Sequence, residues 1–401
     1  MTLPTTDLTD VDTFVEQRHH EVFAWLRANE PVYRDKAGFW ALTRYDDVVA
    51  AYVDHATFSS AGGPMLGGSF STMDADSAAN RMLVASDQPR HRMLRQLLHR
   101  VFGPGYVTAV AHRVEELVDA AVDRALADGG CDFATDIAPE LPAAALMVMV
   151  GVSRAQAHEL IGMTRRMIGF RDPNWVDTSG DERLRLALLQ SDIFEFFADL
   201  LRARRRDPGD DLVSILATAE VNGRRLPEED ILYNCMNVAV GGNETSSYTA
   251  VAGLLALIEN PDQHDLLLAD PDLLDPAVNE MLRWASTNAY VLRVPTTDVE
   301  IGGTLIRARE PVTLWNVSAN RDESQFPDGD RFLVTRSPNR HITYGVGIHR
   351  CIGSPVAQVE LPALFRRLLT SRVRFEQAGE VVRLRSNFIQ GITSLPVRMS
   401  A

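Results

Sequence analysis

The chain has 401 residues, of which 45% are hydrophobic and 23% are charged. This is the composition of a folded globular protein, and it excludes a disordered one. Forty basic residues against 54 acidic ones give a formal net charge of -14, which argues against a general affinity for nucleic acid or for an anionic membrane.

Cysteine content and apolar runs narrow the class further. The chain has three cysteines without a CxxC spacing, so neither a disulfide scaffold nor a structural zinc site is indicated. The longest apolar run, residues 143–152, is half of the roughly 20 residues that span a bilayer. The N-terminal MTLPTTDLTD carries acids where a secretion signal carries bases. We therefore expect a cytoplasmic protein that does not associate with membranes.

The elements predicted in chain order form a large helical body with a smaller β-containing part. Residues 1–20 are expected to be loosely ordered, residues 38–43 are strand-like, and residues 60–79 form a Gly/Ser-rich loop long enough to be functional or mobile. Apolar residues recur every three or four positions from about residue 87 to 285, which predicts helices. Short β-like runs follow residue 293, with one more helix after residue 353. No linker is evident, so residues 1–401 are predicted to be a single domain.

One predicted helix is unusually long. It begins at Pro227, which three acids follow, and it runs to Asn260, a length of roughly 50 Å. Its middle, VGGNETSS, contains two glycines that each cost about 1 kcal/mol relative to alanine. A tight helix crossing would explain them. The alternative is a flat ligand against the glycines, with Glu244 and Thr245 managing protons.

The segment YGVGIHRCIG places Cys351 among glycines, just before a predicted helix. The helix dipole, His349 and Arg350 favour the thiolate, so the sequence predicts an anionic sulfur at neutral pH. A nucleophile, a redox sensor and a metal ligand are all open to such a sulfur. No local signature of a cysteine hydrolase is present, and a lone thiolate in a glycine-rich loop suits the axial ligand of a haem.

Four motifs together resemble the cytochrome P-450 family of haem-thiolate monooxygenases, in particular its soluble bacterial members. YGVGIHRCIG is similar to the family's FGxGxHxCxG signature, with Tyr344 where phenylalanine is commoner. Residues 241–245 resemble the motif A/G-G-x-D/E-T, residues 280–283 resemble ExxR, and residues 87–95 resemble DxPxHxxxR. All stand in the family's order, so the resemblance implies the cytochrome P-450 fold, mainly α, with a long central helix over a buried haem.

The resemblance implies a role for each matching residue. Cys351 is the iron ligand of haem b, and Glu244 and Thr245 supply protons during oxygen activation. Glu280, Arg283 and Arg331 correspond to a structural triad behind the cysteine loop. The other residues implied in cofactor binding, four of them basic partners of the propionates, are His91, Arg95, Arg293, His349, Gly345 and Gly241.

Electrons are expected to come from outside the chain, because no flavin or iron–sulfur motif is visible. A ferredoxin or flavodoxin with its reductase would pass on electrons from NAD(P)H. A monomer is expected, with a basic docking patch for this partner made of Arg92, Arg95, His99, Arg100, Arg350, Arg366 and Arg367.

Family position also places a pocket for a small organic substrate. Its walls are expected within residues 62–82, 163–175 and 388–390, and its contact residues are expected to be Asn237, Val240, Ser286, Asn288, Ala289, Val291 and Ile389. Ser286, Thr287, Asn288 and Gln390 favour a substrate with amide or hydroxyl groups, unless they bond to their own backbone. The residues after Arg283 lack the proline that the family often has there.

The resulting functional hypothesis is hydroxylation or epoxidation in secondary metabolite biosynthesis. Oxidative ring closure or coupling of two substrate atoms is the alternative within the same chemistry. A non-catalytic haem sensor is the alternative from another class.

Overall fold

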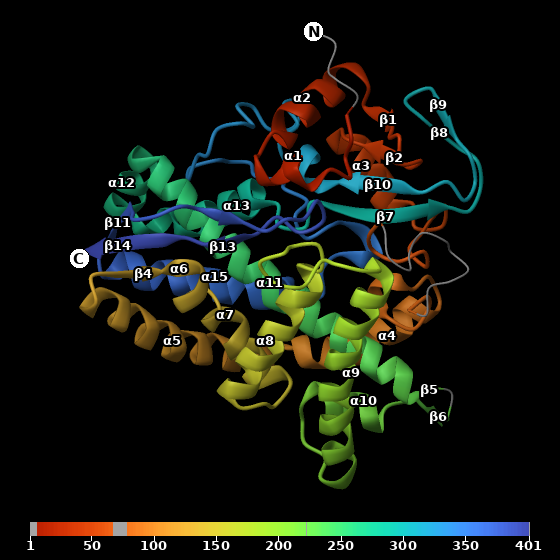
Figure 1. The fold of residues 1–401 in the computed structure, drawn as a ribbon, viewed down its shortest axis with the longest axis horizontal. Helices are drawn as coiled ribbons and strands as arrows, with labels where there is room; N and C mark the ends of the chain where they lie inside the picture. The colour runs from red at the N-terminus through yellow and green to blue at the C-terminus, as the bar shows by residue number, and fades with distance from the viewer. Residues whose placement is uncertain (1–5, 67–77, 222, 401) are drawn as a thin grey trace.

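The structure is a computed structural model that describes residues 6–66, 78–221 and 223–400. A helical body occupies most of the molecule, and a β-rich part stands beside it together with α1, α2 and α3 (Figure 1). The mainly α architecture with a smaller β part, predicted from the sequence, is confirmed. The helices of the body are α4 (Arg90–Leu98), α5 (Pro104–Ala127), α6 (Phe133–Asp136), α7 (Glu140–Met149), α8 (Arg154–Ile168), α9 (Glu182–Arg206), α10 (Leu212–Thr218), α11 (Glu228–Glu259), α12 (Pro261–Ala269), α13 (Leu274–Ala285) and α15 (Ser354–Thr370).

The predicted long helix is α11, which crosses the middle of the body (Figure 1). It has 32 residues and begins after Pro227 with Glu228, Glu229 and Asp230 in its first turn, where acids stabilise the positive end of the helix dipole. Most of its residues are buried on every side, as expected of a central helix. Helices α7, α8, α9, α13 and α15 all pack against it.

The main sheet has the strand order β1-β2-β10-β7-β3. Strand β10 (Val312–Trp315) runs parallel to β2 (Trp40–Leu42), and the other pairings, with β1 (Val32–Arg34), β7 (Tyr290–Pro295) and β3 (Phe58–Ser59), are antiparallel. A second sheet joins β4 (Gly130–Asp132) to the C-terminal strands β11 (Arg374–Gln377) and β14 (Pro396–Ser400). The described strands outside these sheets form the hairpins β5–β6 (Glu220–Val221, Arg224–Arg225), β8–β9 (Val299–Ile301, Thr304–Ile306) and β12–β13 (Val382–Arg383, Ile392–Ser394).

The beginning of the chain is more ordered than the sequence suggested. Helix α1 (Val11–Val15) and the start of α2 (His19–Asn29) lie within the segment expected to be loose. Leu8 and Phe14 are fully buried, and the ring of Phe14 stacks on Trp315 of β10. These contacts correct the expectation for residues 6–20, because apolar side chains anchor the segment to the sheet.

Among the described residues, no single helix has the length and apolar character needed to cross a membrane. One bent pair, Phe133–Met149 with Arg154–Ile168, meets the requirement by length and composition alone.

Candidate functional site

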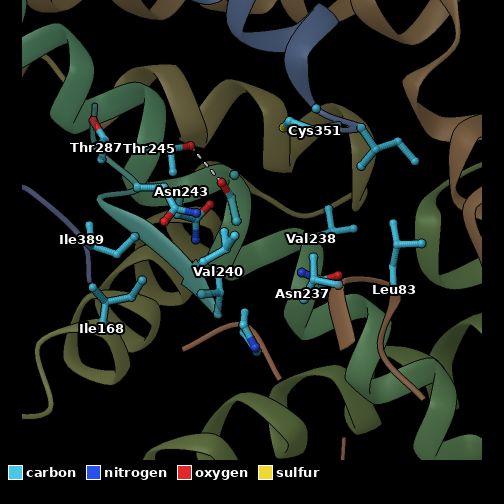
Figure 2. A pocket seen from close by; sticks show the side chains of 18 of the residues that line it. Leu83, Ile168, Asn237, Val238, Val240, Asn243, Thr245, Thr287, Cys351 and Ile389 are labelled. Atoms are coloured by element: carbon cyan, nitrogen blue, oxygen red, sulfur yellow. Dashed lines mark hydrogen bonds between the residues drawn. The ribbon is translucent and has the colours of Figure 1, made fainter. Parts of the chain in front are cut away.

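A cavity of about 400 Å³ lies between α11 and the loop that carries Cys351. Thr245 lines it from α11, and Cys351 stands apart from Thr245 across the view in Figure 2. Gly241 and Gly242 also line the cavity, and a methyl group added to either would meet nothing within 4 Å. The two glycines therefore border open space rather than a helix crossing, which favours the ligand explanation of this motif.

The cysteine loop is held against helix α3 (Tyr45–Val53) by its glycines. Gly345 and Gly347 have positive φ values of 64° and 73°, which side chains other than hydrogen rarely tolerate. A methyl group added to Gly347 would lie 2.9 Å from the carbonyl oxygen of Tyr52, and one added to Gly345 would touch the Tyr52 ring. The close approach that requires glycine here is thus an approach to Tyr52, although Gly345 also lines the cavity.

The surroundings of the Cys351 thiol act on its pKa in opposite directions. Desolvation raises the pKa, whereas the backbone N–H groups of Gly353 and Ser354 together with Arg95 and Arg350 lower it. The helix terminus and the two arginines therefore favour the thiolate, as the sequence indicated, while desolvation opposes it. Coordination to a metal ion would deprotonate the thiol.

Four basic side chains gather at one end of the same cavity. They are His91, Arg95, Arg293 and His349, as predicted. The rings of His91 and His349 lie 4.1 Å apart, and Nε2 of His91 is buried without a hydrogen-bond partner. Burial together with the neighbouring cations lowers the pKa of His91 to about 4 and moves that of His349 further down. The buried guanidinium of Arg293, the partly buried one of Arg95 and the orphaned ring nitrogen would be compensated by anions, and the two propionates of a haem would meet that need.

Thr245 and Glu244 point in different directions from α11. The hydroxyl of Thr245 donates to the Gly241 carbonyl at 2.8 Å, as Figure 2 shows, and it borders the cavity. The Glu244 carboxyl is fully buried and faces α8, where Thr164 donates to Oε1 at 3.4 Å and Arg165 Nε lies 3.4 Å from Oε2. Burial raises the pKa of Glu244, against the opposing effect of Arg165 and of hydrogen bonds from Tyr248 and Thr164. Glu244 therefore stands behind Thr245 rather than beside it in the cavity.

The carboxylate of Glu280 is the centre of a buried network behind the cysteine loop. Arg283 donates to both of its oxygens at 2.7 and 2.8 Å, and Arg336 Nε donates to both at 3.1 and 3.0 Å. Arg331 was predicted as the third member, but its side chain is exposed and only its carbonyl takes part, accepting from Arg283 and Arg336. Arg336 takes that place, and its remaining N–H groups donate to the carbonyls of Pro327, Asp328 and Arg331.

The predicted substrate contacts divide into two groups. Asn237, Val240, Asn288, Val291 and Ile389 line the cavity, whereas Ser286 and Ala289 do not. Ser286 ends α13 in the left-handed conformation and donates to the Arg283 carbonyl at 2.8 Å. Ala289 is fully buried in the cluster around Trp315. The carboxamide of Gln390 donates to the Ser386 carbonyl instead of facing the cavity.

Residues 67–77, part of the predicted pocket loop, lie outside the described ranges. Among the described residues, several that line the cavity had no signal in the sequence. Neighbouring segments supply walls that the motifs did not indicate, because these side chains lie in no motif: Leu83, Gln190, Thr249, Glu360 and Arg385.

Comparison with known proteins decides the family. The family model "Cytochrome P450" matches residues 13–270 and 267–387. The chain is 34% identical to a steroid C26-monooxygenase of Mycobacterium tuberculosis, over 98% of this chain and 97% of that protein. It is 33% identical to linalool 8-monooxygenase of Pseudomonas putida, over 98% of each. The solved structure of OxyD, described as involved in the biosynthesis of vancomycin-type antibiotics, is 34% identical and has a TM-score of 0.87, with 98% of this chain and 99% of that chain covered.

The chain belongs to the cytochrome P-450 family. It is a cytochrome P-450 monooxygenase, and the family implies thiolate-ligated haem iron and chemistry that depends on dioxygen.

In this cytochrome P-450 the predicted basic docking patch is smaller than the sequence indicated. Arg92, His99, Arg100, Arg350 and Arg366 are exposed, but Arg95 lines the cavity and Arg367 is half-buried in ion pairs with Asp119 and Asp123 of α5.

Proposed function

We propose that this cytochrome P-450 binds haem b through Cys351 and hydroxylates or epoxidises a small organic molecule. The observation that carries the proposal is one cavity that joins the Cys351 thiol, the glycine-bordered face of α11 and four basic side chains at one end. Haem b held there would supply the activation of dioxygen. Cys351 would coordinate its iron, and His91, Arg95, Arg293 and His349 would bind the propionates.

The test of this proposal is the spectrum of the reduced, carbon monoxide-bound protein. Thiolate ligation gives the red-shifted Soret band, and Cys351→His should abolish that band while haem stays bound. A wild-type protein that binds haem without the red-shifted band would overturn the assignment of Cys351.

The proton-handling residues of the site are Thr245 and Glu244. The Thr245 hydroxyl borders the cavity and donates its proton to the Gly241 carbonyl, so its oxygen is left to accept a hydrogen bond from a proton-carrying group in the cavity and to position that proton. Glu244 is a buried acid whose pKa is raised by burial, and it supplies protons from behind that hydroxyl. We expect Thr245→Ala to consume NAD(P)H with little product, and a variant that keeps full coupling would refute this role.

A separate ferredoxin or flavodoxin is the proposed electron donor, because the sequence shows no flavin or iron–sulfur motif. The exposed cations Arg100 and Arg350 suit an acidic partner by charge complementarity. Arg100→Glu should weaken partner binding and flatten its dependence on salt. The matched control is Arg307→Glu, the same charge reversal at an exposed arginine that is not part of the predicted patch, which should affect binding much less. Equal losses in both variants would contradict this surface.

A role in secondary metabolite biosynthesis is supported by the likeness to OxyD, whose description names such a pathway. The cavity walls combine apolar side chains with the amides of Asn237 and Asn288, which favours a substrate with hydroxyl or amide groups. Labelled dioxygen distinguishes the outcomes. Label in the product supports oxygenation, whereas reductant consumption without label supports oxidative coupling. Reductant consumption that no ligand stimulates supports a haem sensor.

A further inference from the structure

Glu360 is a buried carboxyl that the proposed reaction does not use. It lies on α15, the helix that follows Cys351, and is 1% exposed while still lining the cavity. Its carboxyl forms a hydrogen bond with the hydroxyl of Ser246 on α11, the neighbour of Thr245 in sequence. Within the described ranges no basic side chain forms an ion pair with it. A carboxyl in this position is costly to ionise and has one neutral partner.

The surroundings of Glu360 leave its charge sensitive to any new charge in the cavity. Burial raises the pKa of Glu360 to about 7, and the hydrogen bond from Ser246 only partly offsets that rise. The hydroxyl of Tyr344 is buried without a hydrogen-bond partner. Burial raises the pKa of Tyr344, and the charges of Cys351 and Glu360 raise it further.

The charged groups on the helices packed against α15 are engaged elsewhere. On the α11 side Glu244 pairs with Arg165, on α13 Glu280 pairs with Arg283, on the α7 side Glu140 pairs with Arg154, and Asp119 and Asp123 of α5 pair with Arg367. None of these groups is among the influences that shift the pKa of Glu360. The titration of Glu360 therefore depends on its burial, on Ser246, and on whatever charge the cavity holds.

We propose that Glu360 is a redox-linked proton site that takes up one proton when an electron reaches the haem iron. This inference rests on the proposed binding of haem by Cys351. The electron comes from the ferredoxin or flavodoxin, and the proton comes from solvent. The Glu360 carboxylate gains an O–H bond as the iron is reduced and loses it on reoxidation. The reason is electrostatic, since added negative charge in a poorly solvated site raises the pKa of a nearby acid. By linkage, the proton in turn favours the electron.

The experiment is a spectroelectrochemical titration of the haem protein between about pH 6 and about pH 9. In the wild type, Glu360 is protonated in both redox states at low pH, so the potential is flat there. Above about pH 7 reduction takes up a proton, so the potential falls with rising pH by up to about 59 mV per tenfold change in proton concentration. Glu360→Gln should remove this slope. It should also have a higher potential than the wild type above pH 7, because it lacks the carboxylate charge. The same slope in wild type and Glu360→Gln would overturn the proposal.

Two further variants keep the test decisive if Glu360→Gln does not fold. Ser246→Ala removes the hydrogen bond that lowers the Glu360 pKa, so the onset of the slope should move to higher pH. Tyr344→Phe should leave the slope in place, and its loss only in Tyr344→Phe would assign the proton to Tyr344 instead and refute the proposal. Redox-difference infrared spectra of the wild type should show a protonated carboxyl band on reduction, and its absence would also count against Glu360.

The two hypotheses fail in different ways. A reduced carbon monoxide complex without the red-shifted Soret band contradicts ligation by Cys351. A normal band together with a potential that does not change with pH contradicts the redox-linked proton alone.

Discussion

Replacement of Arg336 by alanine is expected to lower the free energy of unfolding by about 3–5 kcal/mol, the usual cost of removing one partner from a buried ion pair. Arg336 Nε donates to both oxygens of Glu280, and its other nitrogens donate to the carbonyls of Pro327, Asp328 and Arg331. At about 1 kcal/mol for each of these bonds the sum falls in the same range. Glu280 keeps Arg283, so we expect the loss to destabilise the cysteine loop rather than to prevent folding.

The assay is urea unfolding, followed both by circular dichroism and by the carbon monoxide-bound spectrum. The matched control is Arg331→Ala, whose side chain is exposed and whose loss should change stability by no more than about 0.5 kcal/mol. Both variants leave the Arg331 carbonyl in place. The reasoning would be refuted if Arg331→Ala were as destabilising as Arg336→Ala, or if Arg336→Ala unfolded at the wild-type urea concentration.

Two other perturbations test the packing and the pH dependence of stability. Gly391→Ala would place a methyl group 2.7 Å from the buried ring of Tyr248, which should lower the free energy of unfolding, measured by thermal unfolding, by about 1–3 kcal/mol. The control is Gly105→Ala, whose methyl group would meet nothing within 4 Å and should not destabilise the protein. Equal effects of the two variants would contradict this contact. Burial opposes ionisation of Glu140, but hydrogen bonds and charges from His158 and Arg154 outweigh it and lower the pKa of Glu140. The stability from this carboxylate is therefore present above its ordinary pKa of about 4.3 and is lost as pH falls through the lower folded value. Melting temperatures of Glu140→Gln should depend less on pH over that acidic range than those of the wild type, and parallel curves would exclude the effect.

The sequence was informative wherever a local pattern determines a local structure. The acids after Pro227 and the pair Asn260-Pro261 mark the ends of α11, and the structure begins and ends the helix within two residues of them. The cysteine loop likewise follows from its glycines, since glycine adopts the positive φ of Gly345 and Gly347 without strain. The four basic side chains at the cavity end were found only through the resemblance to the family, because they come from separate segments.

The sequence was least informative where the path of a loop or the rotation of a helix decides which side chains reach the site. Whether Arg331 or Arg336 reaches Glu280 depends on the path of the irregular segment that carries both, and Arg336 is the one that does. Ser286 was expected in the pocket, but a left-handed helix end turns it toward its own backbone. Glu244 and Thr245 are adjacent, and adjacent helix positions point about 100° apart, so both could not face the cavity equally.

The contact of the cysteine loop with Tyr52 has a consequence for how the protein is made. Tyr52 touches Gly345 and Gly347, its hydroxyl donates to Asn316 at 2.9 Å, and its ring faces the guanidinium of Arg293. Helix α3 thus leaves the ribosome long before the loop that it supports. The cavity can close only after the cysteine loop at residues 344–353 has emerged, so a chain that stalls before this loop would expose α3 and the cavity-lining side of α11.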